Sequence, residues 1–292
     1  MILKRHGMLE IHIAVLLFGL AGLFGKWLAL PPILIVFGRT FFASLTLGAI
    51  LFFSKTPIQA KSRQDLAVLM LLGAILAVHW VTFFHSIQVS TVAVGLLTFS
   101  TFPVFVTFLE PCFFKEKLHP IDILTAGSVL LGLVLVVPTF DFQNNVAQGA
   151  FWGTISGLTF AVLSILNRKY VGTYSPIVIA CYQNGIAAVI LFPLILFKKV
   201  TPGSSDIVLL AILGVFCTAL SHVLFIKSLV HLKAQLASII ASLEPVYGII
   251  FAFVLLGEVP ASRTLAGGGI ILGAITLASF KRGRGEKDKF EI

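Results

Sequence analysis

The second half of this chain repeats its first half at a nearly constant offset of 142 residues. Matched positions that keep the same residue include Ser86 and Ser228, Ser100 and Ser242, Pro103 and Pro245, and Glu116 and Glu258. Almost all residues between these positions are apolar. An apolar chain made of two copies of one unit is typical of transporters that bind their substrate between structural repeats. The repeat therefore predicts where a substrate would lie, although it does not name one.

The composition places the chain in a membrane. Of its 292 residues, 58% are hydrophobic and 11% are charged, whereas soluble domains carry roughly 25% charged residues. The net charge of +9 is spread over short loops and a tail instead of one face, which argues against a nucleic acid partner. The three cysteines lie in apolar stretches without metal-ligand spacing. We therefore expect neither a metal nor another cofactor.

The number of membrane spans follows from the lengths of the apolar stretches, because a spanning helix needs about 20 residues. The sequence contains ten such stretches, at 11–30, 32–53, 66–87, 91–113, 119–138, 148–168, 176–197, 206–228, 233–256 and 262–280. Prolines and charged residues separate most of them. We expect an all-α membrane protein with ten transmembrane helices.

The orientation follows from the lysines and arginines, which are enriched in cytoplasmic loops. With the amino terminus inside the cell, 16 of the 21 basic residues lie on the cytoplasmic side. The exceptions are Arg39, within a span, and four residues outside: Lys26, Lys198, Lys199 and Arg263. Both termini are therefore predicted to be cytoplasmic, in a multi-pass protein of the cell inner membrane.

The repeat also predicts the domain organisation. We expect one five-helix repeat over residues 8–138, a second over 148–280, and a basic cytoplasmic tail over 281–292. Because five is an odd number, the two repeats must cross the membrane in opposite directions. Inverted repeats allow one site to be opened to either side of the membrane in turn.

Several short motifs resemble the drug/metabolite transporter superfamily, in its ten-helix EamA family. They are Phe18-Gly19 followed by Lys26 (Trp-Gly-x6-Lys in the family), Pro32 followed by Arg39, Ser242-Leu243-Glu244-Pro245, Leu256-Gly257-Glu258, and Gly268 to Gly273. The resemblance covers residues 8 to 280. Phe18 replaces the family's tryptophan, and in the first copy Phe102 stands where the second copy has Glu244. The glutamate of that motif is thus present only once.

The resemblance implies a secondary transporter that moves a small polar metabolite, often by exporting amino acids or related compounds, through alternating access. The expected partners are the small-molecule substrate, a coupling proton or other ion, and the lipid bilayer, with the protein as a monomer or weak homodimer. Two alternatives remain from the residues alone. A membrane-embedded enzyme would need clustered acids or metal ligands, and a channel would show conductance without saturation.

The candidate substrate-binding residues are polar groups at middle depth in the spans, where an ionisable side chain costs about 2.5–3.5 kcal/mol on insertion scales. They are Arg39, His79, Trp80, Gln183, Asn184, His222, Glu244 and Tyr247. No catalytic residue is predicted.

Each of these residues has a structural alternative. Arg39 could bind a substrate carboxylate or phosphate, or could lock two helices by bonding a helix carbonyl. Gln183 and Asn184 occupy the matching depth in the second copy without a charge, and together with Arg39 would suit a zwitterion. Glu244 could carry protons or hold a substrate amine, or mark a kink before Pro245.

The histidines are open to two interpretations as well. His79 and His222 could line the cavity and titrate near neutral pH, or bond a neighbouring helix. Near the span ends, Lys26 and its counterpart Arg168 are expected to act as anchors. Glu116 and Glu258 are expected to pair with basic residues or loop amides.

Glycine stripes indicate close helix contacts. Gly149, Gly153 and Gly157 form one stripe, and Gly269 and Gly273 form another. We expect them to pack inside the bundle, with a dimer face as the alternative.

Overall fold

A computed structural model describes residues 2–114, 118, 120–137, 143–197 and 200–287 of the chain. All regular secondary structure in these ranges is helical. Eight helical stretches are long and apolar enough to cross a membrane, and Ile123–Val136 and Ser262–Leu277 are shorter apolar helices. The prediction of an all-α membrane protein is confirmed, and the chain is a multi-pass membrane protein.

The described part of the first copy contains six helices. They are α1 (Ile2–Trp27), α2 (Pro32–Phe53), α3 (Arg63–Val89), α4 (Val92–Phe99), α5 (Phe102–Phe114) and α6 (Pro120–Val136). Local sequence sets their starts. Pro32 stands at the first position of α2, where a missing N–H costs nothing. Side-chain oxygens of Ser62 and Thr91 accept backbone N–H groups in the first turns of α3 and α4.

The second copy has corresponding helices. They are α7 (Asn145–Tyr170), α8 (Pro176–Leu196), α9 (Ser204–Gly214), the π-helical turn η1 (Val215–Leu220), α10 (Ser221–Ser228), α11 (Ala234–Ala241), α12 (Glu244–Leu256) and α13 (Ser262–Lys287). The elements α9, η1 and α10 follow one another without a gap and form a single span. The turn η1 has no counterpart in the first copy, where α3 is continuous.

The fourth and ninth spans are each broken into two helices, at the same position of the repeat. The first break lies between α4 and α5 at residues 100–101, and the second between α11 and α12 at residues 242–243. Pro103 and Pro245 follow the breaks, and each ring would clash with the carbonyl four residues earlier. Those carbonyls belong to the last residues of α4 and α11. Each pair of helices was predicted as one span, with a kink before Pro245 as one interpretation of Glu244, and proline accounts for the breaks.

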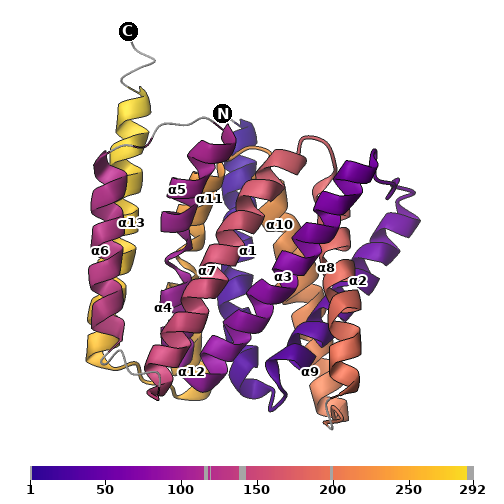
Figure 1. Cartoon of the computed structure of the whole chain (residues 1–292), viewed down its shortest axis with the longest axis horizontal. Helices are drawn as coiled ribbons and strands as arrows, with labels where there is room; N and C mark the ends of the chain where they lie inside the picture. The colour runs from indigo at the N-terminus through magenta and orange to yellow at the C-terminus, as the bar shows by residue number, and fades with distance from the viewer. Residues whose placement is uncertain (1, 115–117, 119, 138–142, 198–199, 288–292) are drawn as a thin grey trace.

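The helices of the two copies pack against one another reciprocally. Helix α3 contacts α7 just as α10 contacts α1, and α7 contacts α4 and α5 just as α1 contacts α11 and α12. Helices α2 and α8 pair across the copies at one side of the bundle, and α6 pairs with α13 at the other (Figure 1). Helix α1 begins and α13 ends at the same end of the bundle (Figure 1). This arrangement puts α1, α3, α7 and α10 at the centre.

The first glycine stripe packs inside the bundle. A Cβ atom on Gly153 would lie 2.0 Å from Thr98 Oγ1, and one on Gly157 would lie 2.8 Å from the Phe99 carbonyl oxygen. Helix α7 can therefore lie close to α4 only because these positions lack side chains. By contrast, a Cβ on Gly269 or Gly273 would meet nothing within 4 Å.

Candidate substrate-binding site

Seven of the eight predicted site residues are buried and come from five different elements. Arg39 on α2, His79 and Trp80 on α3, Gln183 and Asn184 on α8, His222 on α10 and Glu244 on α12 are each at most 4% exposed. Arg39 interacts electrostatically with Glu244, His79 and His222. Tyr247 is half-buried, on the face of α12 that touches Gly19. The two copies thus bring these side chains into one region.

The guanidinium group of Arg39 is bonded along one edge and covered by an aromatic ring on one face. Its Nε donates to Thr218 Oγ1 at 2.9 Å, and its Nη2 donates to the Cys217 carbonyl at 3.1 Å. Its Cζ atom lies 3.4 Å from the centroid of the Trp80 ring, a cation–π contact. Arg39 therefore makes the helix-to-helix bond that the structural alternative expected. Its Nη1 atom, however, is buried without a partner among the described residues.

His79 bonds helix α7 through one ring nitrogen. Its Nδ1 lies 3.0 Å from the Ser156 carbonyl oxygen and 2.9 Å from Ser156 Oγ. Because a carbonyl can only accept, Nδ1 carries the proton and Nε2 of the neutral ring is an acceptor. Nε2 is buried and has no partner in the described part of the chain.

The amides of α8 are held in the same way, each by its nitrogen. Gln183 Nε2 donates to Asn167 Oδ1 at 2.5 Å. Asn184 Nδ2 donates to the Ala180 carbonyl at 2.8 Å and lies 3.3 Å from His222 Nδ1. His222 Nδ1 is therefore the acceptor of that pair, which puts its proton on Nε2.

These contacts leave five site atoms that are buried and without a hydrogen-bond partner among the described residues. They are Arg39 Nη1, His79 Nε2, Trp80 Nε1, Gln183 Oε1 and Asn184 Oδ1. A buried polar group left unpaired costs about 1–3 kcal/mol. Such groups are rare in native proteins and call for an explanation.

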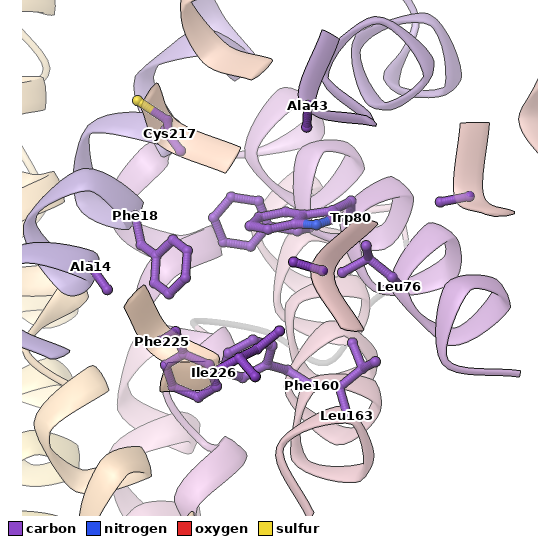
Figure 2. Packing of buried hydrophobic residues seen from close by; sticks show 14 of the residues in the cluster. Ala14, Phe18, Ala43, Leu76, Trp80, Phe160, Leu163, Cys217, Phe225 and Ile226 are labelled. Atoms are coloured by element: carbon purple, nitrogen blue, oxygen red, sulfur yellow. The ribbon is translucent and has the colours of Figure 1, made fainter. Parts of the chain in front are cut away.

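Aromatic side chains from both copies surround this region. Phe18 on α1 and its repeat counterpart Phe160 on α7 have ring centroids 6.5 Å apart, and Phe225 on α10 lies within 6.0 Å of both (Figure 2). Trp80 approaches the same group from α3 (Figure 2). Phe160 and Phe225 were not among the predicted site residues. A signal for them was available in the sequence, because Phe160 and Phe225 follow Phe18 and Phe83 at the repeat offset of 142 residues.

The glutamate of the second copy has an aromatic counterpart in the first. Phe102, the first residue of α5, stacks on Phe99 with ring centroids 5.0 Å apart and an interplanar angle of 24°. It also meets Phe160 edge-on at 5.0 Å. Glu244 occupies the equivalent position, the first residue of α12. The two equivalent positions therefore carry an aromatic side chain in the first copy and a carboxyl group in the second.

At the end of the bundle where α5 and α7 finish, an ion pair joins the two copies. Glu110 on α5 is 2% exposed and pairs with Arg168 on α7. Glu10 on α1 pairs with Lys227 on α10 at 2.8 Å, also across the copies. Tyr182 lies near this end, because its hydroxyl donates to the carbonyl of Ile58, which lies between α2 and α3.

At the opposite end the copies are joined through backbone groups. Glu258 accepts hydrogen bonds from the N–H groups of Val92 at 3.2 Å and Ala93 at 3.3 Å, in the first turn of α4. Within the first copy, Lys26 donates to the Ser90 carbonyl at the same end, at 2.8 Å. The expectation that Glu258 pairs with amides is confirmed, whereas Glu116 lies outside the described residues.

Sequence reasoning missed the residues that orient the site. Thr218, Ser156 and Asn167 are all buried and hold Arg39, His79 and Gln183 respectively. Each is a small polar residue in an apolar helix. Such residues usually bond their own helix, so their sequence positions give no signal of a partner on another helix.

The comparisons with known proteins agree with this architecture. Residues 5–137 and 147–280 match the EamA-like transporter family. A crystal structure shares the fold, with a TM-score of 0.71 at 17% identity, covering 96% of this chain and 98% of the other.

Several curated relatives are transporters. The uncharacterized transporter YxxF of Bacillus subtilis is 26% identical over 96% of this chain and 91% of its own length. The S-adenosylmethionine uptake transporter of Rickettsia felis is 24% identical over 88% of this chain and 86% of its own. The pseudopaline exporter CntI of Pseudomonas aeruginosa is 25% identical over 77% and 79%. The chain belongs to the EamA-like transporter family of the drug/metabolite transporter superfamily, and it is a transporter and not an enzyme.

Proposed function

We propose that this transporter exports an amino acid or a related small polar metabolite across the inner membrane by alternating access, with both termini in the cytoplasm. The observation that carries the proposal is the group of five buried, unpaired polar atoms at the meeting point of the two copies. The substrate supplies their missing partners. The proposed binding set is the one expected from the sequence: Arg39, His79, Trp80, Gln183, Asn184, His222, Glu244 and Tyr247.

The chemistry of these atoms favours a zwitterion. Arg39 Nη1 and Trp80 Nε1 are donors, which suit a carboxylate. Gln183 Oε1 and Asn184 Oδ1 are acceptors, and together with the carboxylate of Glu244 they suit an ammonium group. An α-amino acid carries both groups. S-adenosylmethionine, which the name of the Rickettsia felis relative gives as its substrate, also contains an α-amino acid group.

Alternating access is supported by the burial of the site and by the contacts at both ends. A substrate can reach side chains that are at most 4% exposed only if one end of the bundle opens. The ion pairs at one end and the hydrogen bonds at the other join one copy to the other, so either end opens by separating the copies. Glu244 is the group that we propose to exchange a coupling proton. The resemblance to the family supports export as the direction.

Flux into and out of proteoliposomes tests this proposal. The probes are radiolabelled methionine, S-adenosylmethionine and a panel of other labelled α-amino acids, applied on either side. Arg39→Gln and Glu244→Gln should each lower the flux at least about tenfold, because a hydrogen bond to a charged group contributes about 1.5–3 kcal/mol.

Arg263→Gln is the matched control, because Arg263 is exposed and bonds only carbonyls of α6 in the described structure. Its flux should stay within about twofold of wild type, as expected for a surface change. Wild-type flux in both Arg39→Gln and Glu244→Gln would refute the binding site. Failure of the unaltered protein to move any probe of the panel would refute the substrate class.

A further inference from the structure

We propose that Thr218 is a positioning residue, which uses the π-helical turn η1 to aim the guanidinium of Arg39 at the ligand. The proposal rests on the proposed function only in that Arg39 contacts the substrate. The orientation of Arg39 itself is a property of the protein without ligand, and it can be measured separately.

The turn η1 frees a backbone acceptor for Arg39. The N–H of Ser221 bonds the carbonyls of Phe216 and Thr218 and bypasses that of Cys217, the acceptor that a regular α-helix would use. The Cys217 carbonyl instead accepts Arg39 Nη2 at 3.1 Å. Single π turns within α-helices are rare and are frequent at functional sites. Here the turn presents a carbonyl to a buried arginine.

The hydroxyl of Thr218 makes two hydrogen bonds, one with the Leu213 carbonyl and one with Arg39 Nε, and only one assignment of donor and acceptor satisfies both. It donates its proton to the Leu213 carbonyl, five residues earlier, at 2.7 Å. Its oxygen is then available only as an acceptor, and Arg39 Nε donates to it at 2.9 Å. Valine has nearly the same shape without the hydroxyl, so it would remove the bond to the Leu213 carbonyl and the acceptor of Arg39 Nε.

The outcome is a guanidinium with one free edge. The Nε and Nη2 groups form one edge of the planar fork, and this edge is occupied by Thr218 and the Cys217 carbonyl. The Trp80 ring covers one face. Nη1 lies at the other end of the fork and is the unpaired donor. Thr218 thus determines which part of Arg39 is presented.

Tryptophan fluorescence can report on this geometry without any substrate. The chain has three tryptophans, so Trp27→Phe and Trp152→Phe leave Trp80 as the only emitter, 3.4 Å from the Arg39 Cζ atom. Arg39→Gln should shift the emission maximum of Trp80, and Thr218→Val should shift it in the same direction. Thr218→Ser keeps the hydroxyl and should match the unaltered single-tryptophan protein.

Thr98→Val is the matched control. Thr98 is fully buried like Thr218, but its hydroxyl bonds only carbonyls of its own helix, so Trp80 emission should not change. The proposal is overturned if Thr218→Val leaves the spectrum unchanged, or if Thr218→Ser shifts it as far as valine does. It is also overturned if Arg39→Gln has no effect, because the stacked geometry would then be absent.

Flux measurements separate this proposal from the proposed function. With labelled methionine as the probe, Thr218→Val should raise KM roughly tenfold with Vmax within about twofold of wild type, and Thr218→Ser should restore KM. If Arg39→Gln lowers the flux but Thr218→Val leaves KM unchanged, the positioning role is overturned. If Arg39→Gln shifts Trp80 emission but transports normally, the proposed binding site fails while the orientation of Arg39 by Thr218 stands.

Discussion

At the scale of single residues, the site is defined by how each polar side chain is held from one side. His79 shows this most simply: Nδ1 bonds Ser156 on α7, and Nε2 lies buried among aromatic rings without a described partner. The bonded nitrogen serves the packing of α3 on α7, and the free nitrogen is available to a ligand. The two interpretations of this histidine are thus compatible, because each uses a different nitrogen.

Substitution of His79 can separate these two uses. The amide nitrogen of asparagine matches Nδ1 in position, so His79→Asn should keep the bond to Ser156 and unfold close to the wild-type temperature. His79→Leu removes that bond and should lower stability by about 0.6 kcal/mol, the average for hydrogen bonds between membrane helices, and by no more than about 1.7 kcal/mol. Thermal unfolding in detergent measures the difference. Equal unfolding temperatures for the two variants would contradict the structural use of Nδ1.

The sequence could predict the site residues but not their arrangement. Arg39 and Glu244 stand out as ionisable groups deep in apolar spans, which is a strong signal in any membrane protein. Thr218 and Ser156 are ordinary polar residues in the same spans, and their importance depends on which helix lies opposite. That information comes from tertiary packing, so one sequence cannot supply it.

At the scale of elements, the breaks in the two spans could be predicted from the sequence, whereas the π turn could not. Pro103 and Pro245 stand at the same repeat position, and their effect on a preceding turn is a local steric rule. The breaks before them were therefore available from sequence. The turn η1 contains neither proline nor glycine over residues 215–220. Nothing local marks it, and its contact with Arg39 is the only described reason for its place.

The approach of α7 to α4 makes a prediction at the same scale. Gly153→Ala would place a Cβ atom 2.0 Å from Oγ1 and 3.1 Å from Cβ of Thr98, a β-branched side chain that cannot turn away freely. We expect a loss of about 1–3 kcal/mol in unfolding free energy, as for other overpacked sites. Unfolding in mixed micelles of increasing denaturing detergent content measures it.

Gly269→Ala is the matched control for that experiment. Gly269 lies within α13, which is as long as α7, but a Cβ atom at Gly269 would meet nothing within 4 Å. Its unfolding free energy should be unchanged or slightly higher, because alanine is the better helix former. If both alanine variants were equally stable, close packing of α7 on α4 would not be a source of stability.

At the scale of the whole molecule, the two ends are joined by different chemistry. One end has side-chain ion pairs between the copies, Glu110 with Arg168 and Glu10 with Lys227. At the other end, the carboxylate of Glu258 accepts N–H groups of the first turn of α4. In the proposed cycle each set of contacts must break in turn.

A reversible cross-link tests whether the end at Glu258 opens. After replacement of Cys112, Cys181 and Cys217 by alanine, cysteines at Val92 and Glu258 are joined by a short disulfide-exchanging linker. Flux of labelled methionine should fall to the level of empty vesicles and return on reduction, because the copies can no longer separate. Each single-cysteine protein, treated alike, should transport as before. Undiminished flux in the cross-linked protein would refute opening at this end.

The unequal ends have a thermodynamic consequence. Two identical copies related by an in-plane twofold axis would make the inward-open and outward-open states degenerate in energy in a symmetric bilayer. The chain departs from identity at its contacts: the counterparts of Glu110 and Arg168 are Ala252 and Lys26, and those of Glu10 and Lys227 are Trp152 and His85. The second set provides a ring contact between His85 and Trp152, with centroids 5.3 Å apart, in place of an ion pair. In the proposed cycle, the preference of the empty protein for one side is therefore set by these end contacts, where the duplicated halves carry different residues.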